Sequence, residues 1–300
     1  MGAEERRLKA GGGQDWPPSK AVKEVRGMQY RQVAVIGGKG AGPGQFGAAL
    51  RGIAVDAAGN LYAANDSQIT LFDAGGRLRR RWSTSQPVHS VAVAGDGAVY
   101  TGQIRQIEIF DSAGKLVHTW RDEALLGRVT AIGFVEGDVL AGDATGRAIR
   151  RFDAGGKFRN NIGRDNPLNG LLIPNGVVDF GVDAHGIIHA ANPGKHRVER
   201  YTPAGELLGH IGHFHGTDPA GFGGCCNPTN VAVRDRIYVT EKAGPRAKVY
   251  SFGGELEAVI AADVFDANCK NMSVAVDRRG RVYVADTVKL AIFVFEPEAV

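Results

Sequence analysis

Residues 53–82 read IAVDAAGNLYAANDSQITLFDAGGRLRRRW, and this stretch decides the fold. Four short runs rich in apolar residues are separated by turn sequences such as AAGN and DAGG. Short apolar runs bounded by Gly, Asn and Asp are typical of antiparallel strands joined by tight turns. The stretch therefore predicts four consecutive strands, at residues 53–56, 61–64, 69–72 and 78–82.

The same unit recurs six times along the chain. In each unit the third strand ends in an aromatic residue that is followed by a turn, at Phe72, Phe110, Phe152, Tyr201, Phe252 and Phe295. These aromatic residues are 38, 42, 49, 51 and 43 positions apart. A period of about forty residues with four strands in each unit is typical of propeller blades. The sequence predicts an all-β, six-bladed β-propeller.

The two ends of the chain are expected to close this ring. The sixth unit ends near residue 297 without a fourth strand, whereas residues 31–36 form a spare strand before the first unit. Pairing these two segments would leave no open sheet edge. We expect residues 1–28 to form a poorly ordered lead-in, because they are polar and lack a hydrophobic pattern. Residues 29–300 then form the propeller.

Charge, hydropathy and motifs argue against a nucleic-acid partner, a membrane span and a nucleotide cofactor. The chain has 300 residues and a formal net charge of +4, and its basic residues are not interleaved with aromatic ones, so we expect no nucleic-acid partner. No apolar run reaches the length of a membrane span, and the first residues lack the apolar core of a signal peptide. The match to GxGxxG at residues 42–47 lies in a turn, so we expect no nucleotide cofactor. We expect a monomer.

Three stretches resemble the NHL repeat: GAGPGQFG at 40–47, RGIAVD at 51–56 and GNLYAAN at 59–65. The resemblance covers roughly residues 30–297 and implies a six-bladed propeller without implying an activity. Residues 192–198, 222–229 and 240–246 also resemble segments of a group of bacterial NHL proteins that are mostly predicted to be exported, the second through its GCCNPT loop. This resemblance implies a periplasmic or secreted location.

One face of the predicted propeller carries the longer loops. Strands alternate in direction within a blade, so the loops between second and third strands share a face with the links between blades. The long segments on this face are residues 37–50, 164–176, 212–228 and 261–271. Long loops on a rigid scaffold commonly carry binding and catalysis. We therefore expect the functional site on this long-loop face.

All three cysteines fall on the long-loop face. Cys226 lies five residues before Val231, and Cys269 lies five residues before Val274, each at the start of an inner strand. The two cysteines are 43 residues apart, which matches the local repeat. We expect them at equivalent positions on neighbouring blades, near the axis, with Cys225 beside them, so that the thiols cluster on one side of the channel mouth.

Clustered thiolates favour a soft metal ion. Sulfur ligands select Cu(I), and zinc accepts sulfur together with imidazole. We therefore predict a copper or zinc site, with redox or lyase chemistry on a small anionic ligand if basic residues converge nearby. The predicted metal ligands are Cys225, Cys226, Cys269, His213 and His215.

Disulfides explain the same cysteines without a metal. Cys225 and Cys226 can form a strained vicinal disulfide while Cys269 is buried as a small apolar residue, or Cys269 can bridge to one of the pair. Either arrangement, like three inert thiols, suits a non-catalytic propeller that binds a protein or a ligand. A further alternative is a thiol oxidoreductase with a reversible two-electron couple between the adjacent thiols. The sequence leaves open whether the protein is an enzyme.

Two further groups of polar residues are candidates for ligand binding. On the rim of the long-loop face they are Lys195, His196, Lys242, Arg246 and Glu241; around the axis they are Arg51, His89, Asp179 and Asn230. Converging Lys and Arg side chains would bind a carboxylate, sulfate or phosphate. The alternative for the rim is a solvated surface that pairs with Glu241. His89 resembles a zinc-binding position of the peptidylglycine amidating lyases, but the equivalent positions of the other units hold no histidine, which disfavours a three-histidine site.

Overall fold

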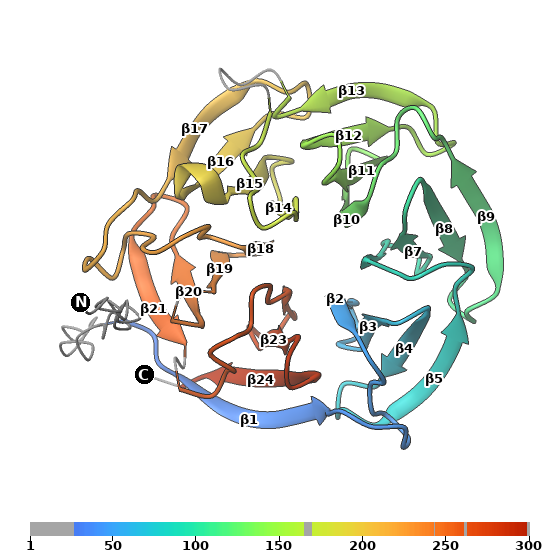
Figure 1. Ribbon diagram of the computed structural model, residues 1–300, viewed down its shortest axis with the longest axis horizontal. Coiled ribbons are helices and arrows are strands. Elements are labelled where there is room, and N and C mark those ends of the chain that lie inside the picture. The colour runs from blue at the N-terminus through green and yellow to red at the C-terminus, as the bar shows by residue number, and fades with distance from the viewer. Residues whose placement is uncertain (1–26, 165–169, 243, 261–262, 299–300) are drawn as a thin grey trace, which may run out of the picture.

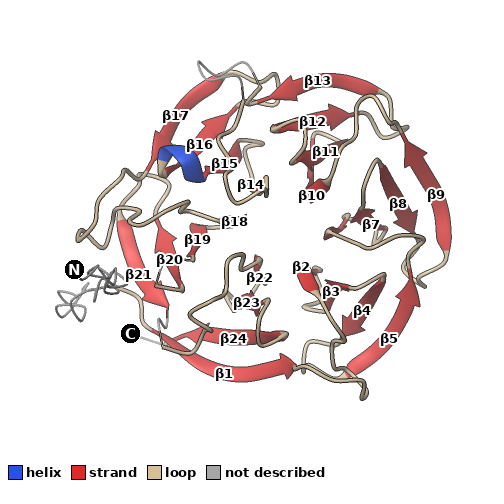
Figure 2. Cartoon of the chain, viewed as in Figure 1, coloured by secondary structure: helices blue, strands red, loops and turns tan. Residues whose placement is uncertain are grey.

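The computed structural model describes residues 27–164, 170–242, 244–260 and 263–298. Within these residues the chain forms six four-stranded antiparallel sheets around a central axis (Figure 1). Apart from the short 3-10 helix η1 (Pro193–Lys195), the regular elements of this part of the chain are strands (Figure 2). None of its helices is long and apolar enough to cross a membrane. The predicted all-β, six-bladed propeller is confirmed.

We number the blades in chain order, and the strands of each blade run outward from the axis. Blade 1 consists of β2 (Leu50–Val55), β3 (Leu61–Asn65), β4 (Gln68–Phe72) and β5 (Leu78–Ser83). Blade 2 consists of β6 (Ser90–Val93), β7 (Val99–Gly102), β8 (Gln106–Phe110) and β9 (Leu116–Arg121). Blade 3 consists of β10 (Val129–Val135), β11 (Asp138–Asp143), β12 (Ala148–Phe152) and β13 (Phe158–Ile162).

The second half of the chain repeats this order. Blade 4 consists of β14 (Phe180–Val182), β15 (Ile188–Asn192), β16 (Arg197–Tyr201) and β17 (Leu207–Ile211). Blade 5 consists of β18 (Asn230–Val233), β19 (Ile237–Glu241), β20 (Arg246–Tyr250) and β21 (Leu256–Ile260). The inner three strands of blade 6 are β22 (Val274–Val276), β23 (Val282–Asp286) and β24 (Ala291–Pro297).

The outer strand of blade 6 comes from the other end of the chain. Strand β1 (Tyr30–Gly37) pairs antiparallel with β24, from Tyr30 opposite Pro297 to Gly37 opposite Ala291. The first and last described strands, β1 and β24, therefore lie side by side at the rim (Figure 1). The predicted ring closure is confirmed, whereas the predicted lead-in of residues 1–28 lies almost entirely outside the described residues.

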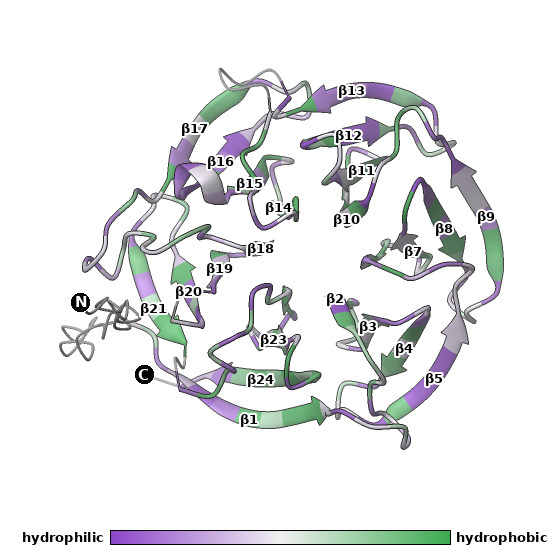
Figure 3. Ribbon diagram, viewed as in Figure 1, coloured by the Kyte–Doolittle hydropathy of each residue, from purple (hydrophilic) through white to green (hydrophobic). Residues whose placement is uncertain are grey.

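A buried aromatic residue lies at or near the end of the third strand of each blade and packs between blades. The six residues with equivalent pairing are Phe72, Phe110, Phe152, Tyr201, Tyr250 and Phe295. The prediction of Phe252 for blade 5 is wrong, because Phe252 lies in the following turn and is 36% exposed, whereas Tyr250 is fully buried. Figure 3 shows the apolar segments along the inner three strands of the blades, for example on β4, β8 and β24, while the outer strand β5 is mainly hydrophilic.

Side chains at the axis join each inner strand to the next. Thr130 Oγ1 donates to the carbonyl of Val178 at 2.8 Å and accepts the N–H of the same residue at 3.0 Å, joining blades 3 and 4. Similar bonds join blades 2 and 3 (Ser90 Oγ to Val129 O, 3.1 Å), blades 6 and 1 (Ile53 N to Ser273 Oγ, 3.1 Å) and blades 5 and 6 (Met272 N to Asn230 Oδ1, 3.2 Å). These bonds place the polar ends of the inner strands around a narrow channel.

Because β1 closes the ring, we predict that Ile36, the buried residue of this strand, contributes to the free energy of unfolding. Ile36 is 8% exposed and packs in a core cluster with Phe46 and Ile292. Ile36→Ala should lower the free energy of unfolding by about 2 kcal/mol or more, because it removes apolar contacts and leaves a cavity. Urea denaturation measures this change. Val35→Ala on the same strand is the matched control, because Val35 is 51% exposed, and an equal loss in both variants would contradict the argument.

Candidate functional site

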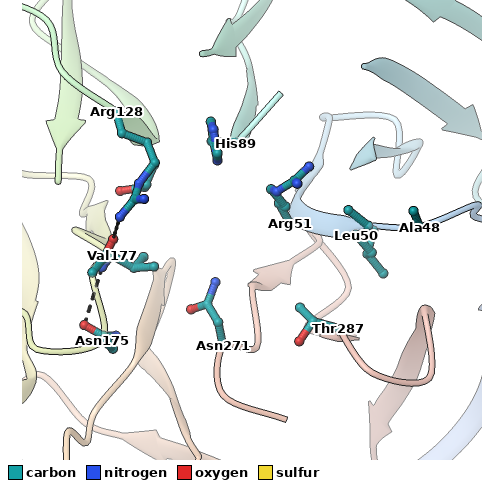
Figure 4. Close-up of a pocket in the computed structure, with 12 residues that line it drawn as sticks. Ala48, Leu50, Arg51, His89, Arg128, Asn175, Val177, Asn271 and Thr287 are labelled. Atoms are coloured by element: carbon teal, nitrogen blue, oxygen red, sulfur yellow. Dashed lines mark hydrogen bonds between the residues drawn. The ribbon is translucent and has the colours of Figure 1, made fainter. Parts of the chain in front are cut away.

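A cavity of about 390 Å³ opens at the mouth of the central channel on the long-loop face. We call it the mouth cavity. Its polar lining consists of Arg51, His89, Arg128, Asn175, Asn271 and Thr287, together with Thr130. Figure 4 shows Arg51, His89 and Arg128 on one side of the opening, with Asn271 and Thr287 across from them. These residues come from blades 1, 2, 3 and 6 and from the β13–β14 link, so only closure of the ring brings them together.

Arg51 and His89 occupy equivalent positions, each four residues before the end of its inner strand. In blade 3 the residue that corresponds to the end of the inner strand is Phe134, which pairs with Val139. Thr130 lies four residues before Phe134 and therefore holds the equivalent position. Arg128 lies two residues earlier and reaches the same cavity with its long side chain. The repeat therefore identified Arg51 and His89, but it could not identify Arg128, which lies out of register with them.

The electrostatics of the mouth cavity favour an anion. No Asp or Glu side chain is among the residues that line it. Arg128 Nη2 donates to the carbonyl of Gly176 at 2.6 Å and Arg51 Nη1 to that of Val88 at 3.5 Å, and neither arginine forms an ion pair within the described part of the chain. Burial and the charges of both arginines lower the pKa of His89 to about 4. At neutral pH the cavity therefore holds two positive charges beside an uncharged imidazole.

A second cavity, of about 230 Å³, continues along the channel and shares Arg51 and Thr130 with the first. Asp179 lines it and accepts hydrogen bonds from the side-chain amide of Asn230 and from the N–H of Phe180, the latter at 2.8 Å. Burial raises the pKa of Asp179 to about 7, although these hydrogen bonds oppose the shift. The structure brings the predicted pair Asp179 and Asn230 together, as a contact between blades 4 and 5.

The predicted rim residues do not form one site. Glu241 is fully buried, and its Oε2 lies 2.5 Å from Arg246 Nε and 3.0 Å from Lys248 Nζ. Lys195 Nζ lies 3.6 Å from Glu199, in blade 4. These cations have carboxylate partners within their own blades. Arg246 pairs with Glu241 as the alternative expects, but the carboxylate is buried rather than solvated. Lys248 was missed because it alternates with the apolar Ala247 and Val249, a pattern that predicts an exposed lysine.

The thiol cluster predicted from the repeat separates into two parts. Cys225 is exposed and Cys226 is buried, and their Sγ atoms lie 2.8 Å apart. Cys269 is 1% exposed; its Sγ lies 3.3 Å from Thr287 Oγ1 and accepts the N–H of Thr287 at 3.4 Å. In blade 5 the corresponding N–H, that of Lys242, is accepted by Asn227 instead, at 2.8 Å. Equivalent sequence positions therefore have different roles in the two blades.

The two histidines proposed as metal ligands have local partners. His213 Nε2 lies 3.3 Å from Asp218 Oδ2, and His215 Nδ1 accepts the N–H groups of Thr217 at 3.2 Å and Asp218 at 2.7 Å. Phe214, between the two histidines, packs against the predicted rim residue His196, with ring centroids 4.7 Å apart. In the described ranges no three His, Cys, Asp or Glu side chains form a group that could hold a metal ion. Copper or zinc binding stays a prediction.

Comparisons with known proteins support the architecture. No family model and no curated protein matches the chain. Among solved structures, the chain is similar to a streptogramin B lyase, with a TM-score of 0.63 and 10% identity over 92% of this chain and 100% of the lyase. It is also similar to a Bacteroides thetaiotaomicron protein of unknown function, with a TM-score of 0.67 and 14% identity over 90% of this chain and 77% of that one.

A third similar structure is a WD40 propeller. The WD40 repeats of RRP9 match with a TM-score of 0.62 and 12% identity over 90% of this chain and 100% of theirs. At identities this low, such similarities show a shared fold but say nothing about a shared activity. The chain is therefore a six-bladed β-propeller, and membership of the NHL family stays a prediction from its sequence motifs.

We predict opposite pKa shifts for two aspartates of blade 4, Asp179 and Asp183. Asp179 should titrate with a midpoint of about 7, because burial disfavours its charged form. Burial also acts on Asp183, but hydrogen bonds from His189 and from the N–H groups of Ile187 and His185 outweigh it and lower the pKa of that carboxyl. Carbon-13 NMR of the side-chain carboxyl groups across a pH series checks both. A midpoint for Asp179 near that of an exposed aspartate would show that the channel is more solvated than the structure indicates.

Proposed function

We propose that this protein binds a small anionic ligand, of the carboxylate or sulfate class, in the mouth cavity. The observation that carries the proposal is the convergence of Arg51 and Arg128 on a cavity that no acidic side chain lines. Two well-buried arginines elsewhere in the propeller, by contrast, have carboxylate partners: Arg150 pairs with Asp143 at 2.7 Å and Arg281 with Asp277 at 2.6 Å. Two arginines without such partners create a positive field, which a bound anion would neutralise.

Neutral polar groups complete the lining of the cavity. Asn175 Nδ2 and Asn271 Oδ1 are buried and have no hydrogen-bond partner in the described part of the protein. Buried polar atoms are normally paired, and both asparagines belong to the cavity lining, so their unpaired groups support a polar ligand that they could reach by side-chain rotation. The neutral imidazole of His89 can donate or accept one further bond. A volume of about 390 Å³ suits a small organic acid.

Binding of a soft metal ion is the second candidate function, and one observation favours it. The Sγ atoms of Cys225 and Cys226 converge, and Cys225 is exposed. Two thiolates can hold a Cu(I) ion without further protein ligands. The remaining predicted ligands bond elsewhere, Cys269 to Thr287 and His215 to a backbone turn. The mouth cavity therefore supports its function better than the thiols support a metal site.

Replacing either arginine should weaken anion binding. Arg51→Ala and Arg128→Ala should each raise the dissociation constant for sulfate about tenfold or more, because a hydrogen bond to a charged group contributes about 1.5–3 kcal/mol. Isothermal titration calorimetry with sulfate measures this, and a panel of mono-, di- and tricarboxylates then ranks ligands. Arg80→Gln, on the outer strand β5, is the matched loss of one charge outside the cavity.

Two results would contradict the proposal. Equal weakening by Arg80→Gln would mean that sulfate responds to the net charge of the protein rather than to the cavity. The absence of saturable binding by the wild-type protein to sulfate and to every acid of the panel would remove the anion site altogether.

Sulfate affinity should also increase as the pH falls from about 8 to 5. Asp179 has a pKa of about 7, so lowering the pH through this value removes a negative charge from the adjoining cavity. His89 has a pKa of about 4 in the free protein, and a bound anion raises it, so binding takes up a proton at the lower end of the range. His89→Gln should abolish the increase at the acidic end and retain the increase near neutrality. Affinity independent of pH would contradict both assignments.

A further inference from the structure

The link between blades 4 and 5 carries a second candidate site, distinct from the lining of the mouth cavity. We propose that Cys225 and Cys226 form a redox-active dithiol, which converts to a vicinal disulfide by exchange with disulfide compounds. This inference rests on the geometry of the link and does not depend on the proposed anion site. Neither cysteine lines the mouth cavity or the channel below it.

The two sulfur atoms are already placed for bond formation. They lie 2.8 Å apart, and an S–S bond measures about 2.05 Å, so closing the bond requires a movement of less than about 1 Å. Cys226 has φ of +66°, a left-handed conformation that a residue with a Cβ rarely adopts. Gly224, just before the pair, also has a positive φ, of +69°. The backbone turns at the pair and brings consecutive side chains to the same side.

Strand β20 anchors the link on the N-terminal side of the pair. Lys248 is fully buried, and its Nζ donates to the carbonyl of Gly221 at 2.7 Å while it pairs with Glu241. The hydroxyl of Tyr250 donates to the carbonyl of Ala220 at 3.0 Å. A buried lysine held by a carboxylate and a carbonyl fixes this part of the link to the core of blade 5.

Asn227 anchors the link on the C-terminal side. Its Nδ2 donates to the carbonyl of Gly223 at 2.9 Å, and its Oδ1 accepts the N–H of Lys242 at 2.8 Å. Asn227 therefore bridges the two ends of the turn that contains both cysteines. Strained backbone persists only where surrounding contacts maintain it, and it is concentrated at functional sites. The anchored turn meets this condition and holds the dithiol ready to close.

The two thiols are suited to different steps. Cys225 is exposed and can reach a disulfide in solution, whereas Cys226 is 6% exposed. Burial and the neighbouring Cys225 raise the pKa of Cys226, while the Lys242 ammonium opposes the shift. Cys226 therefore stays protonated until a mixed disulfide forms beside it. Lys242 is the positioning residue that stabilises its thiolate when it ionises.

One external disulfide, R–S–S–R, is sufficient to oxidise both thiols by thiol–disulfide exchange. The Cys225 thiolate attacks R–S–S–R, forms a Cys225–S–S–R bond and releases RS⁻. Cys226 then loses its proton to solvent, and its thiolate attacks the Cys225 sulfur, forming the Cys225–Cys226 bond and releasing a second RS⁻. Two protein thiols are oxidised and one external disulfide is reduced to two thiols. Excess thiol reverses both steps.

Cys269 provides an internal control. It is 1% exposed and bonded to Thr287 in blade 6, so an oxidant that reacts by exchange should leave it free. A count of thiols in the denatured protein therefore distinguishes the pair from general oxidation. Loss of two thiols out of three supports the proposal, and loss of all three or of none contradicts it.

The experiment equilibrates the full chain with mixtures of glutathione and glutathione disulfide, followed by acid quenching. Thiols are counted after denaturation, and mass spectrometry maps the linkages. We expect three thiols to fall to one, the peptide with both cysteines to lose two hydrogen atoms, and excess glutathione to restore them. Elemental analysis of the reduced protein runs in parallel, because stoichiometric copper or zinc that blocks both thiols from oxidation would overturn the proposal in favour of a metal site.

Variants separate the two roles. Cys226→Ser should accumulate the mixed disulfide of Cys225 with glutathione, since no second thiol can displace it, whereas Cys269→Ser should retain the full reversible couple. A wild-type protein that stops with glutathione on Cys225 would overturn the proposal. If Cys226→Ser does not fold, rapid quenching of the wild type during oxidation tests the same intermediate, which should form and then decay as the disulfide appears.

Discussion

The pairing of β1 with β24 is the interaction on which the rest of the structure depends. Six separate sheets contact only their neighbours, and without closure the first and last blades would each expose an edge and an apolar face. Strand β1 links residues near 30 with residues near 297, so the ring exists only when both ends of the chain are in place. The hydrogen bonds at the axis, such as Thr130 to Val178 and Met272 to Asn230, then set neighbouring blades relative to one another.

Ring closure explains the electrostatics of the channel. Arg51, His89 and Arg128 belong to blades that follow one another along the chain, yet their side chains line the same cavity only because the blades are arranged in a circle. Elsewhere the protein neutralises buried charge locally: Glu241 by Arg246 and Lys248, and Arg150 by Asp143. The mouth cavity differs because its cations have no such partners, and this imbalance is the physical basis for a ligand of opposite charge.

The repeat placed the cysteines on the correct loops but could not assign their roles. Cys226 and Cys269 match in register, and both precede an inner strand. The first N–H group after the second strand has a different acceptor in each blade. In blade 5 Asn227 accepts the N–H of Lys242, and in blade 6 Cys269 accepts the N–H of Thr287. Cys269 makes this bond and is buried in the core, whereas Cys226 does not and lies beside Cys225. The two matching positions therefore give their thiols different environments.

The sequence by itself determined the number of blades, the closing strand and the face that carries the long loops, because hydrophobic period and turn residues are local properties. It also identified Arg51, His89, Asp179 and Asn230 as axial, since the repeat places them at the inner strands. Tertiary structure alone decided that Arg128 joins them, that Lys248 is buried against Glu241, and that Tyr250 rather than Phe252 packs between blades. These features depend on side-chain length, on insertions and on contacts between distant segments, none of which has a period that a sequence pattern can display.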